Sequence, residues 1–172
     1  NPKARGSVEE VVEAANFYTK CYGIYDLMLI VDRDGKILAA NTRSMDGQEL
    51  DTSSMLGQSV RGQTWFEDII SGKTSHGQSF YGPPERDPVV AKVLGNDGYT
   101  LTFAAPIVDD QGQVVRVWSN RASWKRIVGE ILESQRKSLQ EKGAATVQTQ
   151  LLDQNGLTLD DDDDDPSAIL TG

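Results

Sequence analysis

The sequence predicts an α+β fold, in which one antiparallel β-sheet is accompanied by a long N-terminal helix and a C-terminal helix. Two strand–turn–strand patterns predict the sheet, because the turns Asp32–Gly35 and Asp109–Gly112 each separate two apolar runs. In such turns Asp hydrogen-bonds to the nearby backbone, and Gly adopts positive φ without a steric penalty. Apolar residues that recur at helical spacing near both ends predict the two helices.

The N-terminal helix has clear predicted boundaries. Ser7, followed three residues later by Glu10, forms a capping-box pattern, and Gly23 is suited to end the helix. The apolar stripe between them consists of Val8, Val11, Val12, Ala15, either Tyr18 or Thr19, and Tyr22. We expect this stripe to pack on the sheet and part of it to pair with a second copy of the chain in a homodimer.

The middle of the chain is rich in predicted loops. Residues 41–58 are polar and predict a long loop, and loops of this length often carry function. A short helix is expected between residues 63 and 72, with Thr64 as its N-cap and Gly72 at its end. A strand is expected at Gln78–Tyr81, and Asp87–Leu94 fits a turn followed by either a strand or a helical turn.

The C-terminal part predicts a helix followed by a third hairpin. Ser123 is expected to cap the helix and Gly143 to end it. The acidic turn Asp153–Gly156 then separates two short apolar runs, as in the first hairpin. The predicted domain therefore covers residues 1–142. Residues 143–172 are either the start of a second similar unit or a flexible acidic tail.

Composition argues against several classes of protein. The formal net charge is −9, and six of the negative charges lie in Asp160–Asp165. We expect this run to be a solvated segment rather than a metal site, because it lacks the ligand spacing of an EF-hand. An acidic chain without a basic patch argues against nucleic acid as a partner. Cys21 is the single cysteine, so no intrachain disulfide can form. We also expect no cofactor.

The chain is expected to be a piece of a longer protein, because it does not begin with Met. Its longest apolar run is far shorter than the ~20 residues that a membrane-spanning helix needs.

No catalytic constellation is recognisable. The sequence contains no G-x-S-x-G, P-loop, G-x-G-x-x-G or H-E-x-x-H motif. Cys21 and His76 are far apart in sequence, and the pair Asp32 and Asp34 is explained by the hairpin turn. We therefore expect no catalytic residue and no enzyme activity.

Several short motifs follow one another in a specific order after the N-terminal helix. They are Val31–Gly35, Leu56–Val60, Trp65–Phe66, Phe103–Ile107, Asp110–Val115 and Trp118–Trp124. This order resembles the Cache sensor domains of bacterial chemoreceptors and sensor kinases, and most of all the membrane-distal half of a double Cache module. The resemblance covers residues 8–139.

The resemblance implies a PAS-like fold with a small-ligand pocket between the sheet and its loops. It also implies a periplasmic, extracytoplasmic domain of a cell inner membrane protein, such as a methyl-accepting chemotaxis protein. Such a domain binds a small-molecule ligand, and its parent is membrane-anchored. The alternative is a cytoplasmic PAS-type regulatory or dimerisation module without catalysis.

The chain departs from the amino-acid-binding members of that family. There, an Arg two residues before a Trp–aromatic pair binds the ligand carboxylate, but Gln63 stands here and the nearest arginine is Arg61. Phe66 replaces the usual Tyr of the pair, and Arg121 stands where an Asp binds the ligand amine. Because a guanidinium binds carboxylates and repels ammonium groups, we expect a small carboxylate rather than an amino acid.

The candidate ligand-binding residues combine this resemblance with side-chain chemistry. They are Arg61, Trp65, Phe66, Tyr81, Asp87, Phe103 and Arg121. The two adjacent aromatics are equally suited to core packing, and Arg121 to a surface ion pair with Asp26 or Glu130. Strand alternation places Phe103 and Thr102 on opposite faces of one strand, and the sequence leaves open which face lines the pocket.

Overall fold

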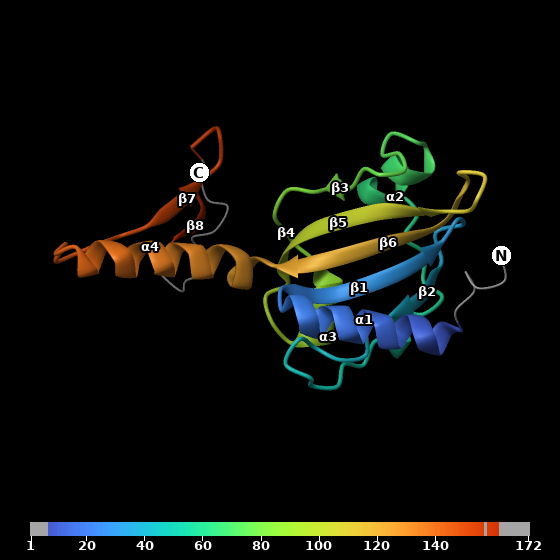
Figure 1. Ribbon diagram of the computed structural model, residues 1–172, viewed down its shortest axis with the longest axis horizontal. Helices are drawn as coiled ribbons and strands as arrows, with labels where there is room; N and C mark the ends of the chain where they lie inside the picture. The colour runs from blue at the N-terminus through green and yellow to red at the C-terminus, as the bar shows by residue number, and fades with distance from the viewer. Residues whose placement is uncertain (1–6, 157, 162–172) are drawn as a thin grey trace. The chain divides into compact units, whose positions relative to one another are not determined.

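The structure is a computed structural model that describes residues 7–156 and 158–161 (Figure 1). The chain divides between Ala122 and Ser123 into two compact units. The first unit contains α1 (Val8–Tyr22), β1 (Tyr25–Asp32), β2 (Ile37–Ala40), the 3₁₀ turn η2 (Ser53–Met55), α2 (Thr64–Ile70), β3 (Phe80–Tyr81), β4 (Glu85–Arg86), α3 (Pro88–Leu94), β5 (Tyr99–Val108) and β6 (Val114–Ser123, whose last residue begins the second unit).

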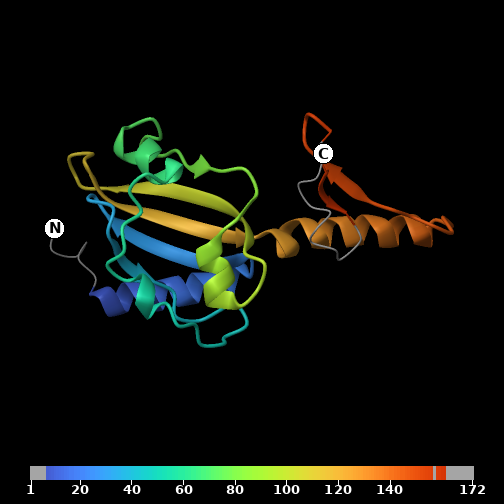
Figure 2. The same cartoon turned by 180° about the vertical axis from the view of Figure 1, so that it is seen from behind.

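A six-stranded sheet forms the centre of the first unit. Its strand order is β2-β1-β6-β5-β3, and β4 also pairs with β5. In Figure 1 the helix α1 lies in front of the sheet, whereas Figure 2 shows α3 in front from the opposite side. The two helices therefore cover opposite faces, and the predicted α+β fold with an antiparallel sheet is confirmed.

The N-terminal helix begins as the sequence predicts. The Ser7 hydroxyl accepts a hydrogen bond from the Glu10 amide, and the Glu10 carboxylate accepts one from the Ser7 amide, which completes the capping box. Gly23 ends the helix with a φ of 66°. On the sheet side, the ring of Tyr18 meets the ring of Trp118 on β6 edge to face. We call the side of the sheet that α1 covers the helix face.

The turns of both long hairpins form through one Asp each. A side-chain oxygen of Asp32 accepts hydrogen bonds from the amides of Asp34 and Lys36, at 2.9 and 2.8 Å. Asp109 repeats the arrangement in the turn between β5 and β6, because its side chain accepts from the amides two and four residues on. These contacts join residues that are close in sequence, so the turn chemistry that predicted the hairpins also forms them.

The opposite side of the sheet, which we call the core face, carries the main hydrophobic core. The opposed pairs of β1 and β6 on this face are Leu27–Arg121, Leu29–Ser119 and Val31–Val117. Apolar side chains from the sheet, α2, α3 and the connecting loops meet there: Leu27, Leu29, Val31, Ile37, Ala40, Met55, Val60, Trp65, Phe66, Ile69, Val90, Ala104 and Val117. Arg121 and Ser119, together with Thr100 and Thr102 of β5, are thus buried polar residues on a largely apolar face.

The segments that cover the core face differ in detail from the sequence-based expectation. Gln63 rather than Thr64 occupies the N-cap of α2, and its side chain makes no capping hydrogen bond. The expected strand at Gln78–Tyr81 is reduced to the two residues of β3. Of the two structures that the sequence allows for residues 87–94, the helical one forms, as α3, because Asp87 caps it and Pro88 occupies its first position.

The second unit contains the π-helical turn η3 (Lys125–Gly129), α4 (Glu130–Glu141), β7 (Gln150–Leu152) and β8 (Thr158–Asp161). Ser123 does not cap the helix, because it is the last residue of β6 and the helical segment starts at Trp124 without a side-chain cap. Gly143, with a φ of 97°, follows the end of α4.

The third predicted hairpin forms between β7 and β8, which pair antiparallel. The first residues of the acidic run are part of it, since Asp160 and Asp161 lie in β8, and the Asp160 carboxylate accepts a 2.6 Å hydrogen bond from the Trp124 indole. Asp162–Asp165 lie outside the described residues. The unit boundary precedes the last helix, so this helix groups with the hairpin rather than with the sheet. The identity of residues 143–172 as the start of a second sensor unit stays a prediction.

Candidate ligand-binding site

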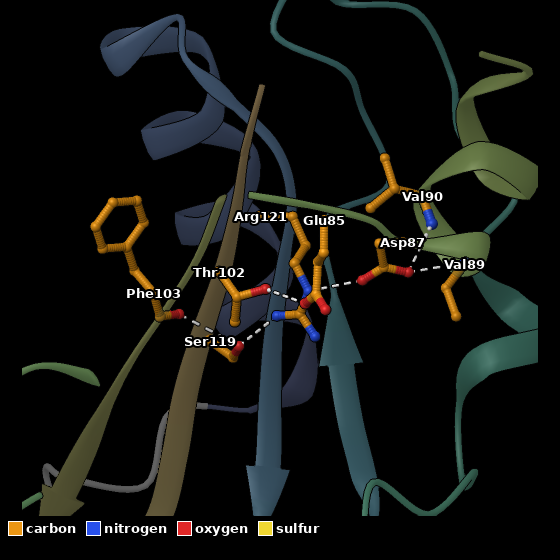
Figure 3. A network of polar contacts seen from close by, with 8 residues as sticks. All are labelled: Glu85, Asp87, Val89, Val90, Thr102, Phe103, Ser119 and Arg121. Carbon is orange, nitrogen blue, oxygen red and sulfur yellow. Dashed lines mark hydrogen bonds and ion pairs between the residues drawn. The ribbon is translucent and has the colours of Figure 1, made fainter. Parts of the chain in front are cut away.

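A buried ion pair lies at one end of the core face. The Nε of Arg121 on β6 donates a 2.8 Å hydrogen bond to an Oδ of Asp87, and the two side chains are 7% and 12% exposed. The other edge of the guanidinium reaches along the strand, because its Nη1 donates to the Ser119 hydroxyl two residues away. Figure 3 shows Arg121 extending from its strand toward Asp87 on the loop before α3. We call Arg121, Asp87, Ser119 and Trp65 the Arg121 cluster.

Asp87 binds both the start of α3 and Arg121 on β6. One carboxylate oxygen caps α3 by accepting from the amides of Val89 and Val90, at 2.8 and 3.2 Å, and the other oxygen accepts from Arg121. The backbone of Asp87 is fixed as well, because its amide donates to the Gly98 carbonyl at 2.8 Å. Gly98 has a φ of +69°, and a Cβ there would lie 2.3 Å from the Asp87 carbonyl oxygen. This close approach requires a glycine.

Trp65 forms the aromatic wall of the cluster. Its ring lies 5.1 Å from the guanidinium carbon of Arg121, within the range of a cation–π contact. The indole Nε1 of Trp65 and the hydroxyl of Thr100 are both buried without a hydrogen-bond partner within the described part of the chain. Because a buried donor without a partner is unfavourable, such groups are candidates to meet a bound acceptor.

Two further polar side chains lie beside the cluster. The Thr102 hydroxyl, on the same face of β5 as Thr100, donates to the Glu85 carboxylate at 3.3 Å. Figure 3 shows the Thr102 and Glu85 side chains joined by this bond. The site thus combines one guanidinium, two carboxylates, hydroxyl groups and an indole. This set suits hydrogen bonding and charge recognition of a small polar molecule.

The structure brings together only some of the predicted ligand-binding residues. Trp65, Asp87 and Arg121 form the cluster, and Phe66 packs against Trp65 with 1% exposure in the adjacent core. Arg121 pairs with Asp87 rather than with either of the surface partners considered from the sequence.

The other three predicted residues lie elsewhere. The exposed Arg61 contacts the first hairpin, where its Nε donates to the Asp34 carbonyl at 2.7 Å. Tyr81 is 79% exposed on the edge strand β3. Figure 3 shows the ring of Phe103 pointing away from the Arg121 cluster, as strand alternation requires for a neighbour of Thr102. Phe103 meets the Arg121 cluster through its backbone rather than its ring, because its carbonyl accepts a 3.3 Å hydrogen bond from the Ser119 hydroxyl.

Sequence reasoning missed Ser119, Glu85 and Thr100 as members or neighbours of the site. Ser119 carried a usable signal, because residues two apart on a strand share a face and Arg121 was already a candidate. Glu85 and Thr100 are opposed in the β4–β5 pairing, and no local pattern in the sequence indicates this pairing.

Residues 7–156 and 158–161 contain no group of three or more His, Cys, Asp or Glu side chains placed to hold a metal ion. Within the same residues, no helix combines the length and apolar character needed to cross a bilayer.

Comparison with known proteins supports the fold. No known family model matches the chain, and no curated protein matches it. Among solved structures, an extracellular ligand-binding receptor from Desulfohalobium retbaense is similar, with a TM-score of 0.66 and 14% identity over 98% of this chain and 26% of its own. The sensory domain of a Campylobacter jejuni chemoreceptor has a TM-score of 0.53 and 16% identity, over 90% of this chain and 52% of its own.

A domain of a sensory box/GGDEF family protein from Vibrio parahaemolyticus is also similar, with a TM-score of 0.50, 12% identity and coverage of 73% of this chain and 46% of its own. The chain therefore spans from about a quarter to about half of the solved chains that it matches. At these identities the likeness concerns the fold. The chain has the fold of the Cache (PAS-like) sensor domains that its sequence resembles.

Proposed function

We propose that this chain is the ligand-binding sensor domain of a bacterial membrane receptor of the methyl-accepting chemotaxis type. In this proposal the domain lies on the periplasmic side of the inner membrane, has no catalytic step and binds a small carboxylate at the Arg121 cluster. The observation that carries the proposal is a buried, polar Arg121 cluster on the apolar face of a sheet whose fold recurs in sensory domains.

The physical argument concerns the position of the cluster. A charged side chain buried in a hydrophobic core adds little to stability even when it is paired, because desolvation offsets the Coulomb attraction. Arg121 and Asp87 lie where α3 and the loop before it cover the sheet, and buried donors of Trp65 and Thr100 remain unpaired. A ligand-binding role accounts for both features, since a bound acceptor would use these donors.

The homodimer contact is proposed for α1. Phe17, Tyr18 and Tyr22 expose 63%, 40% and 62% of their surface and form edge and stacked ring contacts with one another. Adjacent exposed aromatics of this kind are typical of protein contact surfaces. If α1 forms the interface, Phe17→Ser combined with Tyr22→Ser makes the chain monomeric in sedimentation equilibrium at concentrations where the unaltered chain is dimeric. An unchanged mass would contradict the proposed interface.

A thermal-shift screen tests the sensor function. A ligand that binds only the folded state raises the melting temperature as its concentration increases. At a ligand concentration of 100 times Kd, the free energy of unfolding increases by about 2.7 kcal/mol. The panel comprises carboxylates, amino acids, amines and nucleobases. We expect a carboxylate to shift the unaltered chain and Arg116→Gln, but not Arg121→Gln. Arg116 is the matched control, because it lies on the same strand but on the helix face. No shift with any compound would contradict ligand sensing by this domain.

A further inference from the structure

We propose that Asp87 is a resident counter-ion that occupies Arg121 in the unliganded domain and releases it to the carboxylate of the ligand. The inference rests on the proposed sensor function and adds how the site is gated. In this view Asp87 is a competitor of the ligand and not one of its contacts. The release also breaks the bond between Arg121 and Asp87, the N-cap residue of α3, so that ligand binding changes how this helix is held on the sheet.

The geometry of the ion pair supports exchange. Asp87 uses one oxygen for Arg121 and the other for the amides of Val89 and Val90, so it meets the guanidinium through one oxygen, in a hydrogen bond of 2.8 Å. An external carboxylate is free of this second task and can bind a guanidinium through two parallel hydrogen bonds. A ligand can therefore offer Arg121 a better partner than Asp87 does.

The surroundings of Arg121 favour a stationary guanidinium and a moving carboxylate. Ser119 holds Nη1, the Trp65 ring lies 5.1 Å from the guanidinium carbon, and Arg121 itself belongs to the central strand β6. Asp87 belongs to the segment between β4 and α3, at the margin of the sheet. Exchange thus leaves the sheet unchanged and alters the segment that covers it.

The charges around the site explain how Asp87 makes Arg121 selective for a well-fitting carboxylate. With Asp87 in place the Arg121 charge is compensated, and the Asp87 carboxylate repels a second carboxylate that approaches the guanidinium. Repulsion from a carboxylate within a few ångströms is strong when the groups are buried. Weakly binding anions are therefore kept out, and only a carboxylate that also satisfies other groups, such as the unpaired donors of Trp65 and Thr100, displaces Asp87.

The variant Asp87→Asn removes the ion pair with Arg121 but keeps the N-cap of α3. Asn is about as good an N-cap as Asp, so α3 keeps its cap while the negative charge is lost. In this variant the ligand is the counter-ion that Arg121 lacks. We expect affinities for acetate, lactate, pyruvate and succinate, measured by calorimetry at constant ionic strength, to rise about tenfold or more. In the control Asp34→Asn, which removes an exposed carboxylate that pairs with Arg61 at the first hairpin, we expect less than about a threefold change.

The outcomes of this experiment are distinct. Weaker carboxylate binding in Asp87→Asn would show that Asp87 contacts the ligand and would overturn the exchange, as would an unchanged affinity. If no carboxylate binds either protein but an amine or a nucleobase shifts the unaltered chain, the exchange falls while the sensor function stands. If no compound of any class binds, both proposals fall.

A second measurement uses the unaltered chain and does not depend on how well the variant folds. Hydrogen exchange of the α3 amides, residues 88–94, is followed with and without the carboxylate that shifts the melting temperature. The exchange proposal predicts faster amide exchange in α3 on ligand binding, because Asp87 loses its anchor on Arg121, while the amides of β1 and β6 keep or gain protection. Slower exchange in α3 together with the sheet would overturn it.

Discussion

Removing one member of the Arg121–Asp87 pair should destabilise the domain by far more than removing an exposed charge. Both side chains are buried, at 7% and 12% exposure, and their contact is 2.8 Å long. Loss of one partner leaves the other charge buried without a counter-ion, which costs about 3–5 kcal/mol in comparable cases. We therefore expect Arg121→Met and Asp87→Asn each to lower the free energy of unfolding by about 3 kcal/mol.

The double variant makes this prediction specific. When both charges are absent no uncompensated ion remains, so Arg121→Met with Asp87→Asn should cost about as much as one single change rather than the sum of the two. Asp87→Ala should cost about 1 kcal/mol more than Asp87→Asn, because it also removes the cap of α3. Exposed Arg61, which pairs with Asp34 at the surface, is the control, and Arg61→Met should change stability by less than about 1 kcal/mol.

Urea unfolding followed by tryptophan fluorescence measures these differences, because Trp65 lies against Arg121. The slopes of the unfolding curves should agree among the variants, so that the midpoints report stability alone. Additive losses in the double variant, or single losses below about 0.5 kcal/mol, would refute the buried, coupled ion pair.

Three further predictions concern individual contacts that stabilise the fold. Gly98→Ala should lower stability by about 2 kcal/mol or more, because the residue has positive φ and its Cβ would lie 2.3 Å from the Asp87 carbonyl oxygen. Gly95 also has positive φ but open space around it, so Gly95→Ala should cost only about 1 kcal/mol in the same urea assay. Equal losses for the two variants would contradict the close approach at Gly98. Phe66→Ala should lower stability by about 3–5 kcal/mol in thermal denaturation, because the Phe66 ring is buried in the core. Phe17 is 63% exposed, so Phe17→Ala should change stability by less than about 0.5 kcal/mol. Similar losses for both variants would be inconsistent with the described core. Ser7→Ala should lower stability by about 1 kcal/mol and speed amide exchange in the first turn of α1, and unchanged exchange there would argue against the capping box.

Short-range chemistry made part of the fold predictable from the sequence. The capping box of α1 joins residues three apart, and the turn contacts of Asp32 join residues two and four apart. Patterns of this kind are visible in the sequence because the interacting groups are near neighbours. The hairpins and the N-terminal helix were predicted on these grounds, and the structure confirms them.

The candidate site was harder to predict because its contacts join distant residues. Asp87 and Arg121 are 34 positions apart and meet because β4, β5 and β6 are adjacent in the sheet. The sequence also allowed a surface ion pair of Arg121 with Asp26 or Glu130, but in the structure Arg121 pairs with Asp87. Arg61 was chosen by its offset from the aromatic pair, and the structure instead places its side chain at the first hairpin turn.

The start of the last helix shows a competition between two local signals. Ser123 precedes an apolar helical pattern and is a suitable N-cap residue. The long strand β6 nevertheless continues through Ser123, since its pairing with β1 extends to Ala122. Sheet pairing thus overrides a capping preference that is worth only about 1 kcal/mol.

The most direct test of the central claim is the NMR response of the Trp65 indole and the Arg121 guanidinium in the unaltered, ¹⁵N-labelled chain. The Trp65 Nε1–H is buried without a partner in the described structure, so a ligand at the Arg121 cluster should shift its resonance and that of the Arg121 Nε–H at the same concentrations. The indole resonance of Trp118, on the helix face, should stay in place. Saturable shifts that affect Trp118 or α1 and leave Trp65 and Arg121 unchanged would contradict a ligand site on the core face.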